Sequence, residues 1–255
     1  MFKDKITSFI RSFLKKKGYL LVNKFTSEVI KENLIYILLF TKMHQKSIKV
    51  IQIGANDGND LLNKFNNDYR RKVQYIGIEP QEIPFNKLKE TYQGFDNFFF
   101  IRGCIGNEGK RNFYYYNKNF YDHFKGTKNN QGINSLFYDN LSSRLKKKNL
   151  NPDLYIDKYE IEVSSLLNLL KKENINFEDN KNIDLLQIDA EGADDEVIYN
   201  SNLDFFRPSL INFEHKNLTK TKLENLIKFL HQKNYKCLIY KHNDALAVKS
   251  TIEVY

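Results

Sequence analysis

The chain has 255 residues, 41% of them hydrophobic and 14% aromatic, so it can bury one sizeable core as a single domain with a short N-terminal appendage. Its 40 Lys and Arg residues against 31 Asp and Glu residues give a net charge of +9, dispersed rather than gathered into the stripe of a nucleic-acid-binding protein. Cys104 and Cys237 lie far apart without metal-ligand spacing, which favours reduced thiols in a cytoplasmic protein.

Residues 1–44 are expected to form a helical N-terminal segment. From Phe2 to Leu14, apolar residues recur at spacings of three and four between basic flanks, which is one face of a helix. That face packs on its own domain or on a second subunit, or it makes a peripheral contact with an anionic membrane. A second helix is predicted over about 27–43. Its longest apolar run, residues 34–40, is too short to cross a bilayer, and the basic N-terminus is unlike a signal peptide.

Residues 45–255 alternate between strand and helix patterns. Short apolar runs predict strands at residues 49–53, 74–79, 98–101, 183–189 and 209–214, and helical patterns separate most of them. Two further runs, 235–240 and 245–248, are joined only by a turn and predict an antiparallel hairpin. We therefore expect an α/β, Rossmann-like fold with a mostly parallel seven-stranded sheet and a C-terminal antiparallel hairpin.

The stretch between Asn112 and Asp157 has weak periodicity and is predicted to be an insertion. It is expected to contain a strand near residues 113–116 and a helix near residues 136–148. Insertions of this kind often cover active sites, so we expect this one to determine the choice of acceptor.

The first predicted strand runs directly into a glycine turn, Gly54-Ala55-Asn56-Asp57-Gly58. Glycine lets backbone approach a ligand closely, because it has no side chain to collide. Asn56 and Asn59 stand where the dehydrogenase fingerprint has its second and third glycines, which disfavours a dinucleotide. Glu79 ends the second predicted strand, where a carboxylate accepts hydrogen bonds from the ribose hydroxyls of an adenosine ligand.

Asp189 and Glu191 follow the strand at residues 183–189, two positions apart. If the backbone stays extended, both carboxylates face the ligand crevice. Together with His215 they are the candidates for a general base, a group that removes a proton from the attacking atom of a substrate. Glu191 could instead cap the following helix, and His215 could be an ordinary loop histidine. Asp194 and Asp195 lie nearby, but no spacing demands a metal, and none is expected.

These motifs resemble those of the FkbM family of methyltransferases. The resemblance covers about residues 45–250. It rests on Ile53-Gly54-Ala55-Asn56-Asp57-Gly58, Gly77-Ile78-Glu79-Pro80, Ile188-Asp189-Ala190-Glu191-Gly192-Ala193 and the strand from Pro208 to Glu214, with looser matches at Asn134-Ser135-Leu136, Val163-Ser164-Ser165-Leu166 and Gly103-Cys104-Ile105-Gly106-Asn107.

The resemblance implies a class I methyltransferase fold with S-adenosylmethionine as cofactor. It also implies a hydroxyl acceptor in a glycan, glycolipid or secondary metabolite, as in polysaccharide biosynthesis. The predicted cofactor-binding residues are Gly54, Ala55, Asn56, Asp57, Gly58, Glu79, Pro80, Ser135 and Asp189, and the predicted catalytic residues are Asp189, Glu191 and His215.

Two other functions stay open: a nucleic-acid methyltransferase, and an adenosine-ligand-binding module without turnover. The chain lacks the N/D-P-P-Y loop typical of amino-group methylation of bases, since none of its four prolines adjoins another. Neither cysteine follows a proline, as the nucleophile of pyrimidine C5 chemistry usually does. We therefore expect a small-molecule or glycan partner and no nucleic acid.

Overall fold

The computed structural model describes residues 24–124, 134–175, 181–239 and 243–250, and the chain divides into two compact units, residues 1–41 and 42–255. The amphipathic helix predicted over residues 2–14 lies outside the described residues. Helix α2 (Lys24–Gln45) confirms the second predicted helix and includes residues of both units. Within the described ranges, no helix has the length and apolar character needed to span a membrane.

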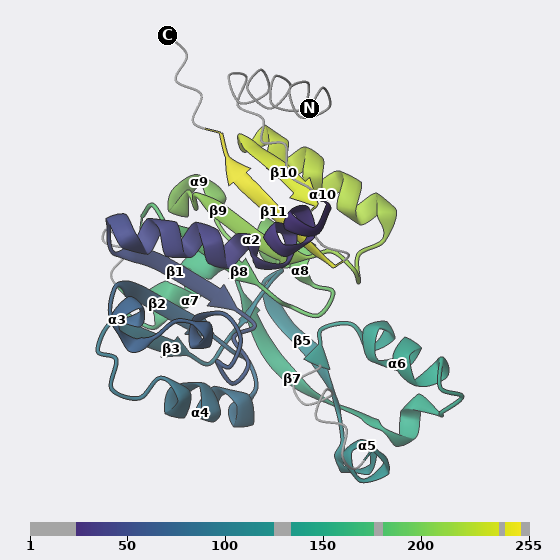
Figure 1. Cartoon of the computed structure of the whole chain (residues 1–255). Coiled ribbons are helices and arrows are strands. Elements are labelled where there is room, and N and C mark those ends of the chain that lie inside the picture. Colours follow the sequence, from purple (N-terminus) through teal and green to yellow (C-terminus); the bar gives the residue numbers. More distant parts are fainter. Residues whose placement is uncertain (1–23, 125–133, 176–180, 240–242, 251–255) are drawn as a thin grey trace, which may run out of the picture. The chain divides into compact units, whose positions relative to one another are not determined.

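The second unit is built on a seven-stranded sheet (Figure 1). Its strands lie in the order β10-β11-β9-β8-β1-β2-β3. Their bounds are β1 (Ile48–Ile53), β2 (Val73–Ile78), β3 (Phe98–Ile101), β8 (Leu185–Ile188), β9 (Leu210–Glu214), β10 (Tyr235–Ile239) and β11 (Asp244–Lys249). Only β11 runs against its neighbours β9 and β10, which confirms the mostly parallel sheet and the C-terminal hairpin.

Short helices connect the strands of this sheet. They are α3 (Asn67–Arg70), α4 (Glu82–Thr91), α7 (Leu166–Lys172), α8 (Asp194–Tyr199), α9 (Leu203–Phe206) and α10 (Lys220–Gln232), with a 3-10 turn η1 (Leu62–Lys64). Ser165 and Thr219 cap α7 and α10 by accepting backbone N–H groups. Val197 and Leu226 then pack, fully buried, against the sheet's Ile51 and Leu186.

A second, four-stranded sheet occupies the predicted insertion. It contains β4 (Cys104–Ile105), β5 (Gly109–Tyr116), β6 (Asn134–Ser135) and β7 (Ile156–Ser164), in the order β4-β7-β5-β6. The predicted strand at residues 113–116 is the last half of β5, and β7 was not predicted. The helices α5 (Lys118–His123) and α6 (Tyr138–Lys146) lie near the far end of the long β5–β7 pair, with the 3-10 turn η3 (Pro152–Leu154) (Figure 1).

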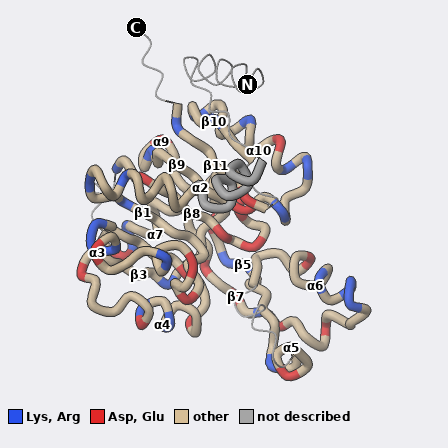
Figure 2. Tube along the Cα trace, in the orientation of Figure 1, with Lys and Arg blue, Asp and Glu red and all other residues tan. Residues whose placement is uncertain are grey.

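Charged residues are interspersed along the described part of the chain (Figure 2). Blue and red segments are both scattered over the described elements in this view. The dispersed charge expected from the sequence therefore agrees with the fold.

Gly54 is a position where the fold requires glycine. Its φ is +75°, and a Cβ atom there would overlap the carbonyl oxygen of Asp189. Gly94 is a matched control, because its φ is +87° but a Cβ atom there would meet nothing within 4 Å. Gly94→Ala should show only the backbone penalty of about 1–2 kcal/mol. We expect Gly54→Ala to lower the free energy of unfolding by at least about 2 kcal/mol more, measured by urea denaturation. Equal losses in the two variants would contradict this requirement.

Candidate active site

The glycine turn is fixed to the strands on both sides of it. The N–H groups of Gly54 and Ala55 both donate to the carbonyl oxygen of Ile78, at 3.0 Å each, which joins the turn to the end of β2. The Asp189 N–H donates to the Ile53 carbonyl oxygen at 3.0 Å, which joins β8 to the end of β1. Gly58 packs on α4, where a Cβ atom would collide with the Tyr92 and Leu88 side chains. The backbone of the turn therefore has little freedom to shift.

A buried polar network supports the turn from β1 and β2. The fully buried Gln52 amide donates to both carboxylate oxygens of Asp60, at 3.1 and 2.9 Å, and accepts from the Tyr75 hydroxyl at 2.9 Å. Burial raises the pKa of Asp60. The sequence analysis missed this network, although a Gln in the middle of an apolar strand is a signal that a buried partner exists.

Glu79 is almost fully buried, with 6% of its surface exposed, and its carboxylate connects the first two strands. One oxygen accepts the Asn56 N–H at 2.9 Å and the other accepts the Gln81 N–H at 3.0 Å. Burial raises the pKa of Glu79 to about 7, although these two hydrogen bonds lower it. Each oxygen still has room to accept a second hydrogen bond from a ligand.

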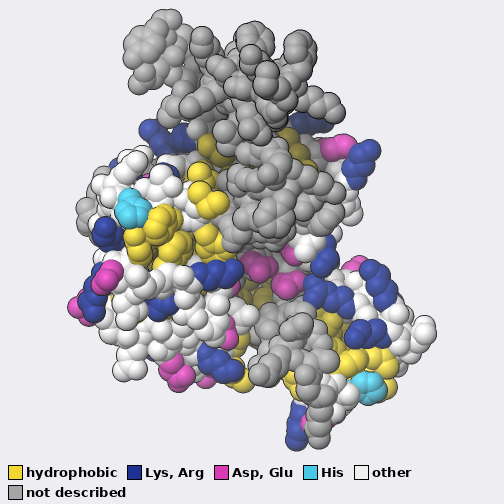
Figure 3. All heavy atoms as spheres, viewed as in Figure 1, with side chains coloured by type: hydrophobic (Ala, Val, Ile, Leu, Met, Phe, Trp, Pro, Cys, Tyr) yellow, Lys and Arg dark blue, Asp and Glu magenta, His cyan; other side chains and the backbone are white. Residues whose placement is uncertain are grey.

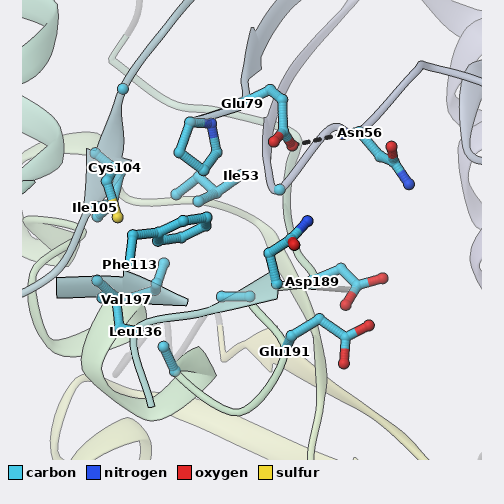
Figure 4. A pocket seen from close by; sticks show the side chains of 16 residues that line it. Ile53, Asn56, Glu79, Cys104, Ile105, Phe113, Leu136, Asp189, Glu191 and Val197 are labelled. Atoms are coloured by element: carbon cyan, nitrogen blue, oxygen red, sulfur yellow. Dashed lines mark hydrogen bonds between the residues drawn. The ribbon is translucent and has the colours of Figure 1, made fainter. Parts of the chain in front are cut away.

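A cavity of about 270 Å³ opens at the carboxyl ends of β1, β2, β3 and β8 (Figure 4). Of the predicted cofactor-binding residues, Gly54, Asn56, Glu79, Pro80 and Asp189 line it. The other four predicted residues do not line the cavity: Ala55, Asp57, Gly58 and Ser135. They form hydrogen bonds that fix the glycine turn and the insertion. The sequence analysis did not assign the lining residues Gly103, Cys104, Ile105, Phe113, Asn134, Leu136 and Val197 to the site.

Asp189 and Glu191 both line the cavity, with their carboxylates on one side of it (Figure 4). The extended backbone assumed for this pair is wrong, because Glu191 has a φ of +45° and Gly192 a φ of +92°. Asp189 is an exposed residue by its surface area, and it opens into the cavity. The protein atoms around the cavity desolvate its carboxylate, and this desolvation, with the charges of Glu191 and Glu214, raises the pKa of Asp189 to about 7.

The turn that carries Glu191 is held by buried acceptors and by the insertion. Asp194 is completely buried and accepts the N–H groups of Gly192 at 3.2 Å and Glu214 at 3.1 Å. The Ser135 hydroxyl donates to the Glu191 carbonyl oxygen at 2.9 Å. Ser135 therefore supports the site without lining it, and its neighbours Asn134 and Leu136 reach the cavity.

His215 is not brought to the cavity. The backbone N–H of His215 donates to the Asn243 carbonyl oxygen at 2.7 Å, and the imidazole ring does not line the cavity. Its Nε2 atom is buried and finds no hydrogen-bond partner among the described residues. Within the same ranges, no three His, Cys, Asp or Glu side chains are grouped so as to hold a metal ion.

The sheet order, with one reversed strand, and a cavity at the carboxyl ends of its parallel strands define a class I methyltransferase fold. The model of the methyltransferase FkbM domain matches residues 52–237. The chain therefore belongs to the FkbM family of methyltransferases, and its cofactor is S-adenosylmethionine, as the sequence predicts.

Three solved structures with a similar fold are distant in sequence from this chain. The human methyltransferase 10 domain containing protein is 13% identical, with 98% of each chain covered and a TM-score of 0.41. The METTL16 MTase domain is 14% identical, with 91% of this chain and 70% of that chain covered and a TM-score of 0.44. Aeropyrum pernix fibrillarin with natively bound S-adenosyl-L-methionine is 9% identical, with 79% and 66% covered and a TM-score of 0.37. No curated protein matches the chain.

The Glu79 carboxylate predicts a pH-dependent affinity for S-adenosylmethionine. Glu79→Gln should weaken binding by about 1–3 kcal/mol at pH 8.5, because a charged acceptor of ribose hydroxyls is lost. The difference from the wild type should shrink as the pH falls below about 7, where Glu79 itself becomes protonated and resembles glutamine. Isothermal titration calorimetry between pH 5.5 and 8.5 measures both quantities.

Glu82 provides the control for this measurement. It lies three residues further on, exposed at the surface in an ion pair with Arg102 at 3.2 Å. Glu82→Gln should bind S-adenosylmethionine like the wild type at every pH, and NAD should bind to none of the three proteins. An affinity that does not depend on Glu79 at high pH would remove this residue from the cofactor site.

Proposed function

We propose that the chain O-methylates a hydroxyl group of a glycan, glycolipid or secondary metabolite. The observation that carries this proposal is that one cavity is lined by the glycine turn, by Glu79 and by the carboxylate of Asp189, whose pKa is raised to about 7. S-adenosylmethionine, when bound, supplies an electrophilic methyl group on a positively charged sulfur. The chain has to orient that methyl group, exclude water and accept one proton.

Residues at the ends of β1 and β2 are proposed to hold the cofactor. Gly54 and Asn56 present backbone to the cavity, and Glu79 presents two carboxylate oxygens to ribose hydroxyls. Gly103 and Cys104, which follow β3, add an uncharged wall. The fit is supported by Glu79, which is buried and whose oxygens each accept one hydrogen bond from the described residues, so each can accept a second one from a ligand.

Asp189 is the proposed general base. A hydroxyl group is a weak nucleophile until its proton leaves, and a carboxylate with a pKa near the working pH removes protons most efficiently. As the hydroxyl oxygen forms its bond to the methyl carbon, its proton passes to Asp189 and the electron pair of the carbon–sulfur bond stays on sulfur. Asp189 has to be ionised to accept this proton, so the reaction should accelerate as the pH rises through about 7.

The surroundings of Asp189 favour an uncharged acceptor over a nucleic acid. The carboxylates of Glu191, Glu214, Asp60 and Asp244 all raise its pKa, which shows that they act on the same space. Acidic side chains are visible in the middle of the molecule, with basic side chains beside them (Figure 3). The acidic groups around Asp189 disfavour a phosphate in the immediate surroundings of this carboxylate. Phe113, Asn134 and Leu136 of the insertion form the remaining wall, which supports a role for the insertion in acceptor choice.

We also propose a cellular compartment for the chain and a role for its N-terminal segment. Both cysteines are free, and Cys104 is buried, which supports a reducing compartment such as the cytoplasm. The amphipathic face of residues 2–14 is proposed as a peripheral contact with a membrane or a subunit.

Comparison of cells with and without the chain tests the acceptor class. Mass spectrometry of glycans, glycolipids and small metabolites should find one species that loses a single methyl group, 14 mass units, when the chain is absent. A cofactor that binds without any such loss would favour the adenosine-ligand-binding module. A methyl group lost from RNA or DNA alone would favour the nucleic-acid methyltransferase.

Three substitutions test the base once the acceptor is known. Asp189→Asn should lower the turnover number by about 10²- to 10⁴-fold, the range of a general base. His215→Asn should leave it within about threefold of the wild type, since this ring does not line the cavity. Glu191→Gln is measured beside them, and S-adenosylmethionine affinity is determined separately for each variant. Turnover that survives in Asp189→Asn but fails in one of the other two would transfer the role to that residue.

A further inference from the structure

The insertion helix α6 makes three polar contacts with Glu191 and its neighbourhood. Asn140 donates its amide hydrogens to the Glu191 carbonyl oxygen at 2.8 Å and to the Ser135 hydroxyl oxygen at 3.1 Å. One turn further along α6, Arg144 donates through Nη2 to Oε2 of Glu191 at 2.7 Å. A Cβ atom on Gly192 would overlap the Asn140 amide, so helix and turn also touch sterically.

These contacts hold a strained backbone. Glu191 has a φ of +45°, a conformation that costs a residue with a side chain about 1–3 kcal/mol and persists only when neighbours enforce it. Here the neighbours act on both ends of the residue, since Ser135 and Asn140 hold its carbonyl group and Arg144 holds its carboxylate. The side chain of Glu191 is 23% exposed and that of Arg144 is 33% exposed, so the pair lies at the edge of the cavity.

The two carboxylates of the cavity therefore have different partners. Glu191 has a cation at hydrogen-bond distance, whereas Asp189 has no ion-pair partner within the described ranges. The charged groups that act on Asp189 are Glu191, which neighbours it in the turn, Glu214 of β9, Asp60 beyond the glycine turn, Asp244 of β11 and Asp194 of α8. All five are acidic, and the nearby cations Arg144 and Lys216 act on Glu214. The nearby positive charges therefore affect Asp189 only through its acidic neighbours.

We propose that Arg144 is a positioning residue, which neutralises and orients Glu191 and thereby leaves Asp189 as the carboxylate that exchanges a proton in the cavity. This inference rests on the proposed function for its meaning in methyl transfer, but its electrostatic content concerns residues of this chain alone. Two nearby carboxylates in different environments divide the roles of an acid–base pair in this way. Arg144 does not line the cavity and acts through Glu191.

The titration of Asp189 tests the proposal without any ligand. Protein labelled with ¹³C at the aspartate carboxyl carbons is titrated by NMR, and the Asp189 signal is assigned by its loss in Asp189→Asn. Arg144→Gln should raise the midpoint pH of the Asp189 titration by about 0.5 or more, because the negative charge of Glu191 then has no cation beside it. Arg144→Lys keeps the charge and should restore most of the wild-type midpoint.

Two controls separate a specific effect from a general one. Lys146 lies on the same helix, exposed, so Lys146→Gln removes an equal charge and should leave the Asp189 midpoint within about 0.1 pH. In a Glu191→Gln background, Arg144→Gln should produce less than half of its original shift, because the residue through which it acts is gone. Circular dichroism verifies that each variant remains folded.

The proposal is overturned if Arg144→Gln leaves the Asp189 midpoint unchanged, if Lys146→Gln moves it equally, or if the full shift persists without Glu191. If Arg144→Gln unfolds, Arg144→Met removes the same charge while keeping a long side chain, and it should raise the midpoint pH of Asp189 by about 0.5 or more; an unchanged midpoint in this folded variant overturns the proposal. Failure of the proposed function appears elsewhere, as wild-type protein that methylates no hydroxyl, and does not alter these titrations.

Discussion

The approach of the Gly54 backbone to the Asp189 carbonyl group determines the geometry of the whole site. It brings the ends of β1 and β8 together at a point where no side chain fits between them. The same turn fastens its N–H groups to the end of β2, so that Glu79 reaches the cavity from the other side. A parallel sheet places the carboxyl ends of its central strands along one edge. Here that edge carries the carboxylates of Glu79 and Asp189.

The second sheet supplies residues to the cavity wall and also supports the turn that carries Glu191. Its strand β5 contributes Phe113 to the cavity wall, and its short strand β6 places Asn134 toward the cavity and Ser135 toward the Glu191 turn. Alternation of side chains along a strand explains why neighbouring residues have such different roles. The insertion thus both shapes the space for an acceptor and stabilises the turn that bears the proposed catalytic carboxylates.

Much of the fold was predictable because the central strands are continuous apolar runs. Residues 98–101 were predicted with the correct bounds, and the hairpin near the C-terminus followed from a short turn between two such runs. Strand β7 was missed although its Tyr159, Ile161 and Val163 alternate with polar residues, the period-two pattern typical of a half-buried strand. Glu79 and Asp189 were predicted from their positions at strand ends, and both reach the cavity.

Contacts between distant segments account for what the sequence could not reveal. Arg144 is one of many basic residues on a surface-like stretch, and nothing in its neighbours indicates that it pairs with Glu191, 47 positions away. The left-handed backbone of Glu191 is likewise a tertiary effect, since the residue type alone favours an ordinary conformation. His215 follows a strand end just as Asp189 does, but its backbone bond to Asn243 belongs to the outer part of the sheet.

The pairing of β1 with β8 also has a consequence for how the chain matures. Val50 lies beside Leu185, so the central pair of the sheet closes only after the glycine turn, the insertion and most of the chain have been synthesised. Contacts of such long range are formed late and slowly. The cofactor cavity is lined by residues at the ends of both strands. A nascent chain therefore has no binding site for S-adenosylmethionine until β8 pairs with β1. Binding then stabilises only molecules that have completed this step, so cofactor occupancy reports that β8 has docked beside β1.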